Sequence, residues 1–421
     1  MIIASVLFAV VFICITLELF NKTVIALFGA SIFILFHFIS QHDAFLEIDW
    51  NVVFLLISMM IIVGITKQTG LFQYIAIKTA KLAKGDPIVI LISLSVITAV
   101  FSAFLDNVTT VLILTPVSIL IAVELGLSPL PFIISEAIFS NIGGMATLIG
   151  DPPNLMIGSA ANISFLEFSK YVGPIAVIDI IVISIFFYFI FRKQLTIKNE
   201  RKARIMEFDE SKTIEDKAKL VKAVSVLGLT IMGFLLHGLF HLEPATISLS
   251  GAALLMIIMG KHEVEKFFHE VEWETIFFFI GLFILVGGLV ELGVIEKMSK
   301  FIIALTKNNI NHTAYVIIWV SGIFSGIIDN IPFVATMIPL VENIGDTMGA
   351  NAIKPLWIAL SLGSCLGGNG TLIGASANVI SAGICEKSGY KISFLDFTKY
   401  GAMVTLITLI TSTIYINLVF F

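Results

Sequence analysis

Long apolar runs alternate with short polar segments along the whole chain, and most runs approach the ~20 residues that a helix needs to cross a bilayer. The pattern predicts an all-α, polytopic membrane protein. Residues 70–84 carry spaced lysines within an apolar background, which predicts an amphipathic helix on the membrane surface. Uninterrupted spans are predicted at residues 2–20, 23–40, 50–66, 171–191, 223–240, 246–259, 273–290 and 400–420.

Four further apolar stretches are broken in the middle by polar or helix-breaking residues. Non-helical backbone at membrane depth survives only where protein or a water-filled cavity satisfies its polar groups. Two breaks predict re-entrant hairpins at about 88–123 and 314–344, and two predict unwound helices at about 150–154 and 374–378. Broken helices expose free N–H groups and carbonyls, which suit anions and cations respectively.

The second half of the chain repeats the first. EIDWNVVFLL begins at Glu47 and EVEWETIFFF at Glu270, while FSAFLDNVTTVLILTPV begins at Phe101 and FSGIIDNIPFVATMIPL at Phe324, so both pairs lie 223 residues apart. The chain therefore divides into repeats at 1–191 and 223–421, each with five spans and one re-entrant hairpin. An odd number of crossings inverts one repeat relative to the other, as in many secondary transporters.

Composition and charge agree with a membrane protein. Hydrophobic residues make up 58% of the chain and charged residues only 13%, and the net charge of −5 gives no reason to expect a nucleic-acid partner. Residues 192–222 hold ten Lys and Arg and are interpreted as a charged, solvated linker. The positive-inside rule then predicts a cytoplasmic linker, both termini outside, and a plasma or inner membrane location.

Two carboxylates in the hairpin breaks are the sharpest functional candidates. Asp106 and Asp329 occupy matching positions of the repeats, each followed by an Asn. A carboxylate inside the bilayer is costly and marks a functional site by default, here one that binds a proton or sodium. The alternative is a helix cap at an aqueous hairpin tip, and capping can accompany an ion-binding role.

The unwound helices form the second group of candidates. Asp151, Pro152, Pro153 and Asn154 interrupt the first, but residues 375–377 of the second repeat are Ala-Ser-Ala, so the site cannot be chemically symmetric. An ordinary turn is the alternative. Nearby residues predict close backbone approach instead. These are Gly143, Gly144 and Thr147, with Gly367, Gly368 and Thr371 in the second repeat.

Two polar residues of an apolar span and several missing motifs complete the picture. Glu136 and Asn141 are candidates for a proton relay or for support of the site, although Glu136 could also lie at the cytoplasmic edge of its span. No GxxxxGK[ST], HExxH or GxSxG occurs. The sequence therefore predicts neither an enzyme nor direct use of ATP, and no cofactor beyond a coupling sodium ion or proton.

At these motifs the chain resembles the arsenite-permease/P-protein family of the ion transporter superfamily, closest to its P-protein-like branch. The resemblance rests on FLDNVTTVLILTPV, NIGGMATLIGDPPN, DNIPFVATMIP and LGGNGTLIGASANV. More distantly the chain is similar to NhaD-type sodium/proton antiporters and to divalent anion/sodium symporters. The resemblance implies a scaffold domain and a transport domain, a homodimer, and a site for substrate and sodium enclosed by the hairpin tips and unwound helices.

Carried over to this sequence, the resemblance implies a set of site residues. Sodium ligands are expected among Asn107, Asn154, Asn330 and Asn378. The full substrate- and ion-binding set is Asp106, Asn107, Thr109, Asp151, Asn154, Asp329, Asn330, Ser376 and Asn378, surrounded by Glu136, Asn141, Thr147, Gly150, Thr371 and Gly374.

The predicted function is an ion-coupled secondary transporter of a small anion or its neutral acid, arsenite- or antimonite-like by resemblance, driven by a proton or sodium gradient. A sodium/proton antiporter is the main alternative. A sodium/dicarboxylate symporter is disfavoured, because the symporters resembled here carry Ser-Asn-Thr at both hairpin tips where this chain has Asp-Asn. Broken inverted repeats favour alternating access over a passive channel.

Overall fold

The computed structural model describes residues 2–16, 20–240, 242–260 and 264–421. Within these ranges all regular structure is helical, with 21 α-helices, one short 3-10 helix and no strand. This confirms the predicted all-α class. Residues 17–19, near the end of the first predicted span, lie outside the described residues.

The helices of the first half follow the predicted order. α10 begins at Phe165, before the predicted residue 171, because the Ser164 side chain caps it by accepting from the Glu167 N–H. The bounds are α1 Ile2–Thr16, α2 Lys22–Leu35, α3 Gln41–Leu46, α4 Trp50–Lys67, α5 Leu71–Leu82, α6 Pro87–Ser102, α7 Asn107–Glu124, α8 Leu130–Met145, α9 Pro152–Ala160 and α10 Phe165–Phe191.

The second half repeats this order after the linker. Trp50 and Trp273 begin α4 and α15, and Asn107 and Asn330 begin α7 and α18; both pairs are 223 residues apart. The bounds are α11 Asn199–Met206, η1 Glu210–Thr213, α12 Lys217–Phe240, α13 Pro244–Met259, α14 Val264–Phe268, α15 Trp273–Glu291, α16 Val294–Leu305, α17 Ile310–Ser325, α18 Asn330–Met348, α19 Ala350–Gly367, α20 Ser376–Lys387 and α21 Phe394–Phe420.

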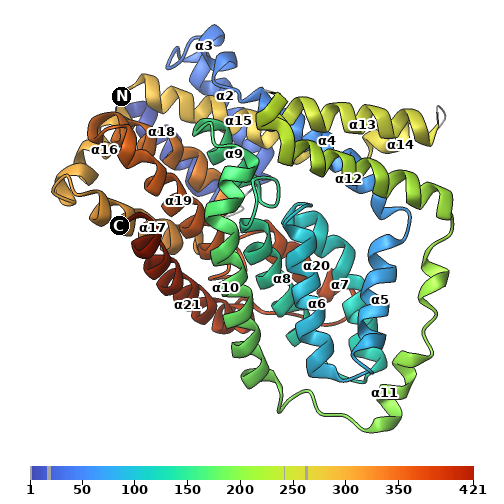
Figure 1. The fold of residues 1–421 in the computed structure, drawn as a ribbon. Helices are drawn as coiled ribbons and strands as arrows, with labels where there is room; N and C mark the ends of the chain where they lie inside the picture. Colours follow the sequence, from blue (N-terminus) through green and yellow to red (C-terminus); the bar gives the residue numbers. More distant parts are fainter. Residues whose placement is uncertain (1, 17–19, 241, 261–263) are drawn as a thin grey trace.

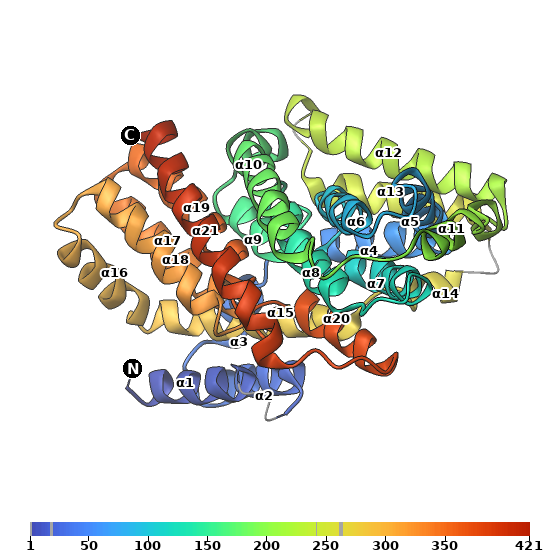
Figure 2. The same cartoon turned by 90° about the horizontal axis from the view of Figure 1, so that it is seen from below.

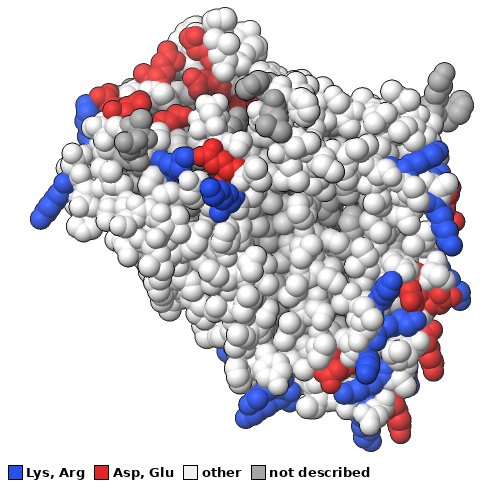
Figure 3. All heavy atoms as spheres, in the orientation of Figure 1, with Lys and Arg blue, Asp and Glu red and all other residues white. Residues whose placement is uncertain are grey.

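The surface and the helix lengths both fit a multi-pass membrane protein. Six described helices, α4, α7, α10, α12, α15 and α21, are long and apolar enough to cross a bilayer. The shorter apolar helices α6, α8, α17 and α19 belong to the broken stretches, so each is only part of a predicted segment. In Figure 3 the charged side chains gather mainly at two ends of the molecule, with a broad uncharged surface between them.

The helices form two packed groups. In one, α2 packs against α15 and α4 against α13, with α12 beside α13 (Figures 1 and 2). The other is a bundle in which α6 packs on α8 and α17 on α19, while α20 lies against α7 and α8. The long helices α10 and α21 border this bundle. The broken helices of both repeats thus meet inside one bundle.

The linker is docked on the first half rather than simply solvated. Ile205 of α11 is fully buried, and Arg201 donates to the carbonyls of Leu125 (3.2 Å) and Gly126 (2.9 Å) at the end of α7. Lys202 pairs with Asp86 at 2.9 Å. The connection is also shorter than the predicted 192–222, because α12 already begins at Lys217.

Ion pairing makes this docking dependent on pH. Lys81 of α5 donates to the carboxylate of Glu210 in η1 at 2.6 Å, and this bond lowers the pKa of Glu210 below its ordinary value. A carboxyl pKa that is lowered by docking stabilises the docked form at pH values above the ordinary pKa of a glutamate. This contribution is lost as the pH falls through the lowered pKa. This ion pair therefore contributes to docking at neutral pH and is lost in acid.

Arg201→Ala is expected to loosen the linker. The substitution removes two hydrogen bonds at a helix C-terminus, about 1–2 kcal/mol of docking free energy. Local opening should then rise roughly 5- to 30-fold. The measurement is the rate of cleavage within residues 200–215 by a glutamate-specific protease, whose sites the substitution leaves intact. Lys212→Ala is the control, because that side chain is 81% exposed, and equal cleavage rates in the two variants would contradict the docking role.

Candidate functional site

Asp106 and Asp329 each cap the helix that follows a hairpin break. Asp106 accepts a hydrogen bond from the Thr109 N–H at 2.7 Å, and Asp329 accepts one from the Ile331 N–H at 3.1 Å. The capping role weighed from sequence is therefore real. Each cap uses a single oxygen, Oδ1, and both carboxylates also line the cavity described below. Capping and ligand binding are thus compatible.

The two hairpin tips meet on Asp151. Asn107 donates from Nδ2 to Asp151 Oδ1, and Asn330 donates from Nδ2 to Asp151 Oδ2, both at 3.3 Å. Asp151 occupies the N-cap position of α9 at the end of the first unwound segment, makes no side-chain capping hydrogen bond there, and is only 1% exposed. One buried carboxylate therefore connects three breaks that are far apart in the sequence.

Asn141 on α8 extends this network into the second half. Its oxygen accepts from Asn107 at 3.0 Å, and its amide donates to the side-chain oxygens of Asn369 at 2.9 Å and Asn378 at 3.0 Å. Sequence reasoning missed Asn369, which follows α19 and is fully buried. Its relation to Asn141 is long-range, so no local signal marked it.

Asn154 and Asn378 lie in helices rather than in the breaks. The observed breaks run from 146 to 151 and from 368 to 375, because α9 begins at Pro152 and α20 at Ser376. Asn154 donates to the carbonyls of Met145 and Thr147, both at 3.2 Å, and Asn378 donates to those of Gly368 (2.8 Å) and Thr371 (3.0 Å). These amides satisfy the carbonyls that unwinding frees, as buried polar backbone requires.

The side-chain oxygens of Asn154 and Asn378 also accept hydrogen bonds from protein donors. Asn154 Oδ1 accepts from Ser361 at 2.7 Å, and Asn378 Oδ1 accepts from Asn141. Both amides therefore hold the two halves of the bundle together in this structure. Asn107 and Asn330, which line the cavity, are better placed to meet a bound ion.

The predicted close backbone approach at the glycines is confirmed. A Cβ on Gly143 would lie 2.1 Å from the Ala99 carbonyl oxygen, and one on Gly144 would lie 2.5 Å from the Gly150 oxygen. In the second repeat a Cβ on Gly367 would lie 2.5 Å from the Gly322 oxygen. No side chain fits at such distances, so the glycines let the helices that shape the site cross in contact.

The surrounding hydroxyl groups support the turns. Thr147 donates to the Ala103 carbonyl, and Thr371 donates to the Gly326 carbonyl at 2.6 Å. Gly150 and Gly374 sit against the Ser102 and Ser325 backbones. These residues fix each unwound segment to the neighbouring hairpin.

A cavity of about 260 Å³ lies where the breaks converge. Leu56, Met60 and Phe278 give it an apolar wall. Thr109, Asn154 and Asn378 do not line it. The predicted residues that line it are Asp106, Asn107, Asp151, Asp329, Asn330 and Ser376, joined by Lys22, Glu272 and Thr275.

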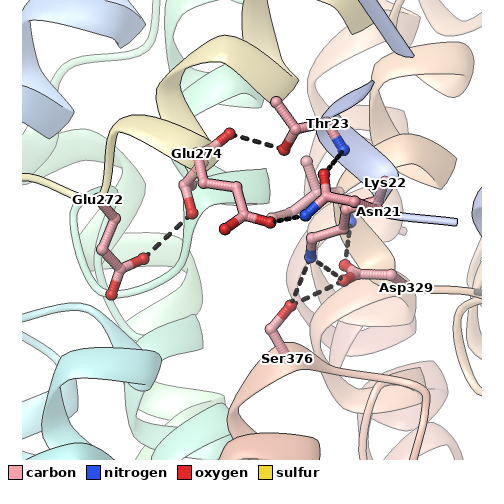
Figure 4. Close-up of polar contacts among 9 residues, drawn as sticks. Asn21, Lys22, Thr23, Glu272, Glu274, Asp329 and Ser376 are labelled. Atoms are coloured by element: carbon pink, nitrogen blue, oxygen red, sulfur yellow. Dashed lines mark hydrogen bonds and ion pairs between the residues drawn. The ribbon is translucent and has the colours of Figure 1, made fainter. Parts of the chain in front are cut away.

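Lys22, Glu272 and Thr275 line the cavity but were not predicted from the sequence. Lys22 reaches the broken helices from the start of α2, far away in the sequence, and lies 3.2 Å from Asp329 Oδ2 (Figure 4). Glu272 precedes α15 in the repeated EVEW block, opposite Asp49 in the first repeat, and this symmetry was a usable signal. With Asp106, Asp151 and Asp329, the lining holds four carboxyl groups and one ammonium group.

Glu136 is buried inside the bundle rather than exposed at an edge. Ser118 on α7 donates to its Oε1, and its Oε2 has no hydrogen-bond partner within the described part of the chain. The side chain is 1% exposed and does not line the cavity. Burial removes this carboxyl group from solvent, while its position relative to the cytoplasmic edge of the membrane stays a prediction.

A second hollow of about 330 Å³ lies between α4, the α9–α10 turn and the α12–α13 turn. It contains none of the predicted site residues. His237 lies in it and accepts from the Phe165 N–H at 3.1 Å through Nε2, so its Nδ1 donates to the Leu242 carbonyl at 3.1 Å. This hollow is distinct from the cavity at the breaks.

An all-helical, multi-pass protein whose broken helices surround a small polar cavity is a membrane transporter by class. The chain belongs to the citrate transporter family (CitMHS), which matches residues 12–363.

Three relatives illustrate this membership. An uncharacterized transporter of Mycobacterium tuberculosis is 42% identical over 425 residues, covering 100% of this chain and 99% of that protein. The 46 kDa membrane protein of Mycobacterium leprae is 41% identical over 420 residues, with 99% and 98% covered. The human P protein is 33% identical over 481 residues, covering 95% of this chain and 57% of the P protein. The predicted resemblance to the P-protein branch is confirmed.

Proposed function

We propose that this protein is an ion-coupled secondary transporter for a small anion or its neutral acid, driven by a proton or sodium gradient. The observation that carries the proposal is the meeting of two Asp-Asn tips and Asp151 at one cavity. Such a cavity offers a cation several oxygen ligands and offers a small polar solute amide and hydroxyl groups. A bundle of broken helices that packs against a separate group of helices suits alternating access.

The size and charge of the cavity restrict the substrate. About 260 Å³ lies below the ~300–1,000 Å³ usual for pockets that hold drug-sized ligands, so the substrate is small. Four carboxyl groups against one ammonium group repel a free multivalent anion. Citrate, which the family description names, would need bound cations or protons to enter. A neutral acid of the arsenous or antimonous type meets no such barrier.

A sodium/proton antiporter is the second candidate, favoured by the same excess of carboxyl groups. In that case sodium and protons compete for Asp106, Asp151 and Asp329, and no other substrate is carried. The two candidates share a site and differ only in whether a solute crosses with the ions.

The deciding experiment uses purified protein in proteoliposomes with separately imposed sodium and pH gradients. Uptake of arsenite, antimonite or citrate that requires one of the gradients supports the ion-coupled transport of a solute. Sodium-driven proton movement with no added solute supports the antiporter. Solute flux that ignores both gradients, or unitary currents in bilayers, would contradict ion-coupled transport.

We propose further that the linker faces the cytoplasm, that both termini lie outside, and that the protein works as a homodimer in the plasma or inner membrane. The excess of Lys and Arg around the linker supports this orientation. Labelling of single cysteines placed in α11 tests it, and labelling from the outside of intact cells would overturn it. The dimer rests on family resemblance, and crosslinking in membranes tests it.

A further inference from the structure

Lys22 lies at the start of α2, which packs against α15 in the group of helices beside the bundle. We call this α2–α15 pair the layer. Asn21 caps α2 by accepting from the Thr23 and Val24 N–H groups, and its amide donates to Glu274 of α15. Thr23 donates to the Glu274 carbonyl at 2.8 Å. α2 then packs along α15, so the backbone of Lys22 is fixed to this layer (Figure 4).

The ammonium group of Lys22 ends in the bundle instead. It lies 3.2 Å from Asp329 Oδ2 and 3.1 Å from Ser376 Oγ. Ser376 in turn donates to Asp329 Oδ2 at 2.8 Å. Asp329 belongs to the tip before α18 and Ser376 to the start of α20. The side chain of Lys22 therefore adds a polar link between α2 and the second-repeat half of the site, beside the packing of α15 against α18.

The two halves of the cavity differ in this respect. Lys22 is the one basic residue among those that line the cavity in the described part of the chain. It pairs with Asp329, whereas Asp106, the matching residue of the first repeat, forms no ion pair with a described Lys or Arg. The half-site at Asp329 thus already holds a positive charge at ion-pair distance.

We propose that Lys22 is a tethered cation that occupies Asp329 in place of a transported ion, and that it leaves when the coupling ion binds. This inference rests on the proposed function. Unlike a transported ion, the ammonium group of Lys22 cannot be released across the membrane, because α2 is held to α15. An ion that binds Asp329 must therefore displace the ammonium group, whereas an ion at Asp106 meets no such competitor. Displacement also breaks this polar link between α2 and the bundle, which couples ion binding to movement of the bundle.

Lys22→Gln tests the competition directly. The measurement is the melting temperature of the purified, full-length protein as a function of sodium concentration, with choline keeping the ionic strength constant. A second series varies the pH. Loss of this partly buried, competing ion pair should lower the sodium concentration, or the proton concentration, at half-maximal stabilisation roughly fivefold. Lys22→Arg keeps a cation at this position and should show no such shift. Lys22→Met serves the same purpose as Lys22→Gln if the latter does not fold.

Two controls make the result specific. In an Asp329→Asn background Lys22→Gln should cause no further shift, because the competition needs the carboxylate. Lys354→Gln removes an ion pair with Glu167 at 2.5 Å outside the cavity and should not change the ion dependence. Equal half-maximal concentrations in wild type, Lys22→Gln and Lys22→Met would overturn the role of Lys22. A wild-type protein stabilised by neither sodium nor protons would instead contradict the proposed function itself.

Discussion

Asp151→Asn is expected to reduce coupled transport by about 100-fold or more while the protein remains folded. Asp151 accepts Asn107 on one oxygen and Asn330 on the other. An asparagine has a single oxygen and turns its NH₂ group toward one of these donors, so one hairpin tip loses its partner. A buried hydrogen bond to a charged group is worth about 3 kcal/mol at most, which corresponds to roughly 100-fold. The lost negative charge adds to this effect.

The measurement is the initial rate of gradient-driven uptake in proteoliposomes at equal protein density. Asp179→Asn is the matched control, because Asp179 is also a fully buried carboxylate but lies between α10 and α21, where it accepts from Thr411 at 2.6 Å. It does not line the cavity, so its loss should leave most of the uptake. Uptake in Asp151→Asn within tenfold of the wild type would contradict a central role for this carboxylate.

Gly143→Ala is expected to destabilise the fold by about 3 kcal/mol or more, since overpacking of this kind forces the backbone to shift. The added Cβ would lie 2.1 Å from the Ala99 oxygen and 2.4 Å from the Ala99 Cα. No flexible side chain can yield, so α6 and α8 must move apart and carry the first hairpin tip with them. We expect a lower apparent melting temperature and a smaller monodisperse fraction in detergent.

Gly228→Ala on α12 is the comparison, because a Cβ there would meet nothing within 4 Å. An alanine at that position should be neutral or stabilise by up to about 1 kcal/mol, since glycine is a poor helix former. Equal melting temperatures for Gly143→Ala and the wild type would show that α6 and α8 do not cross as closely as described here.

Local patterns predicted the helices and six of the nine polar residues that line the cavity. Apolar run length marked the spans, and the Asp-Asn pairs at 106 and 329 marked the hairpin tips, because a polar pair inside an apolar run has few structural explanations. The repeat then linked the two tips, since equivalent residues of two repeats occupy equivalent places. Six predicted residues line the cavity as a result.

The partners of these residues could not be predicted in the same way. Asn154 resembled a ligand in the sequence, but its amide is engaged by the carbonyls of its own break and by Ser361. No pattern in the sequence indicates this, because a carbonyl freed by unwinding acquires its partner only when the chain folds back on itself. Glu136 was likewise ambiguous until its burial beside Ser118 was known.

Residue order and local periodicity were enough to predict the helical membrane class, the two repeats, the four breaks and the resemblance to the P-protein branch. Which residues meet depends instead on the packing of the helices. This packing placed both Asn tips on Asp151, crossed α6 and α8 at Gly143, and brought Lys22 to Asp329 across 307 residues of chain. Such contacts depend on how separate helices pack. The residue pattern within one helix does not indicate which residues of another helix it will contact.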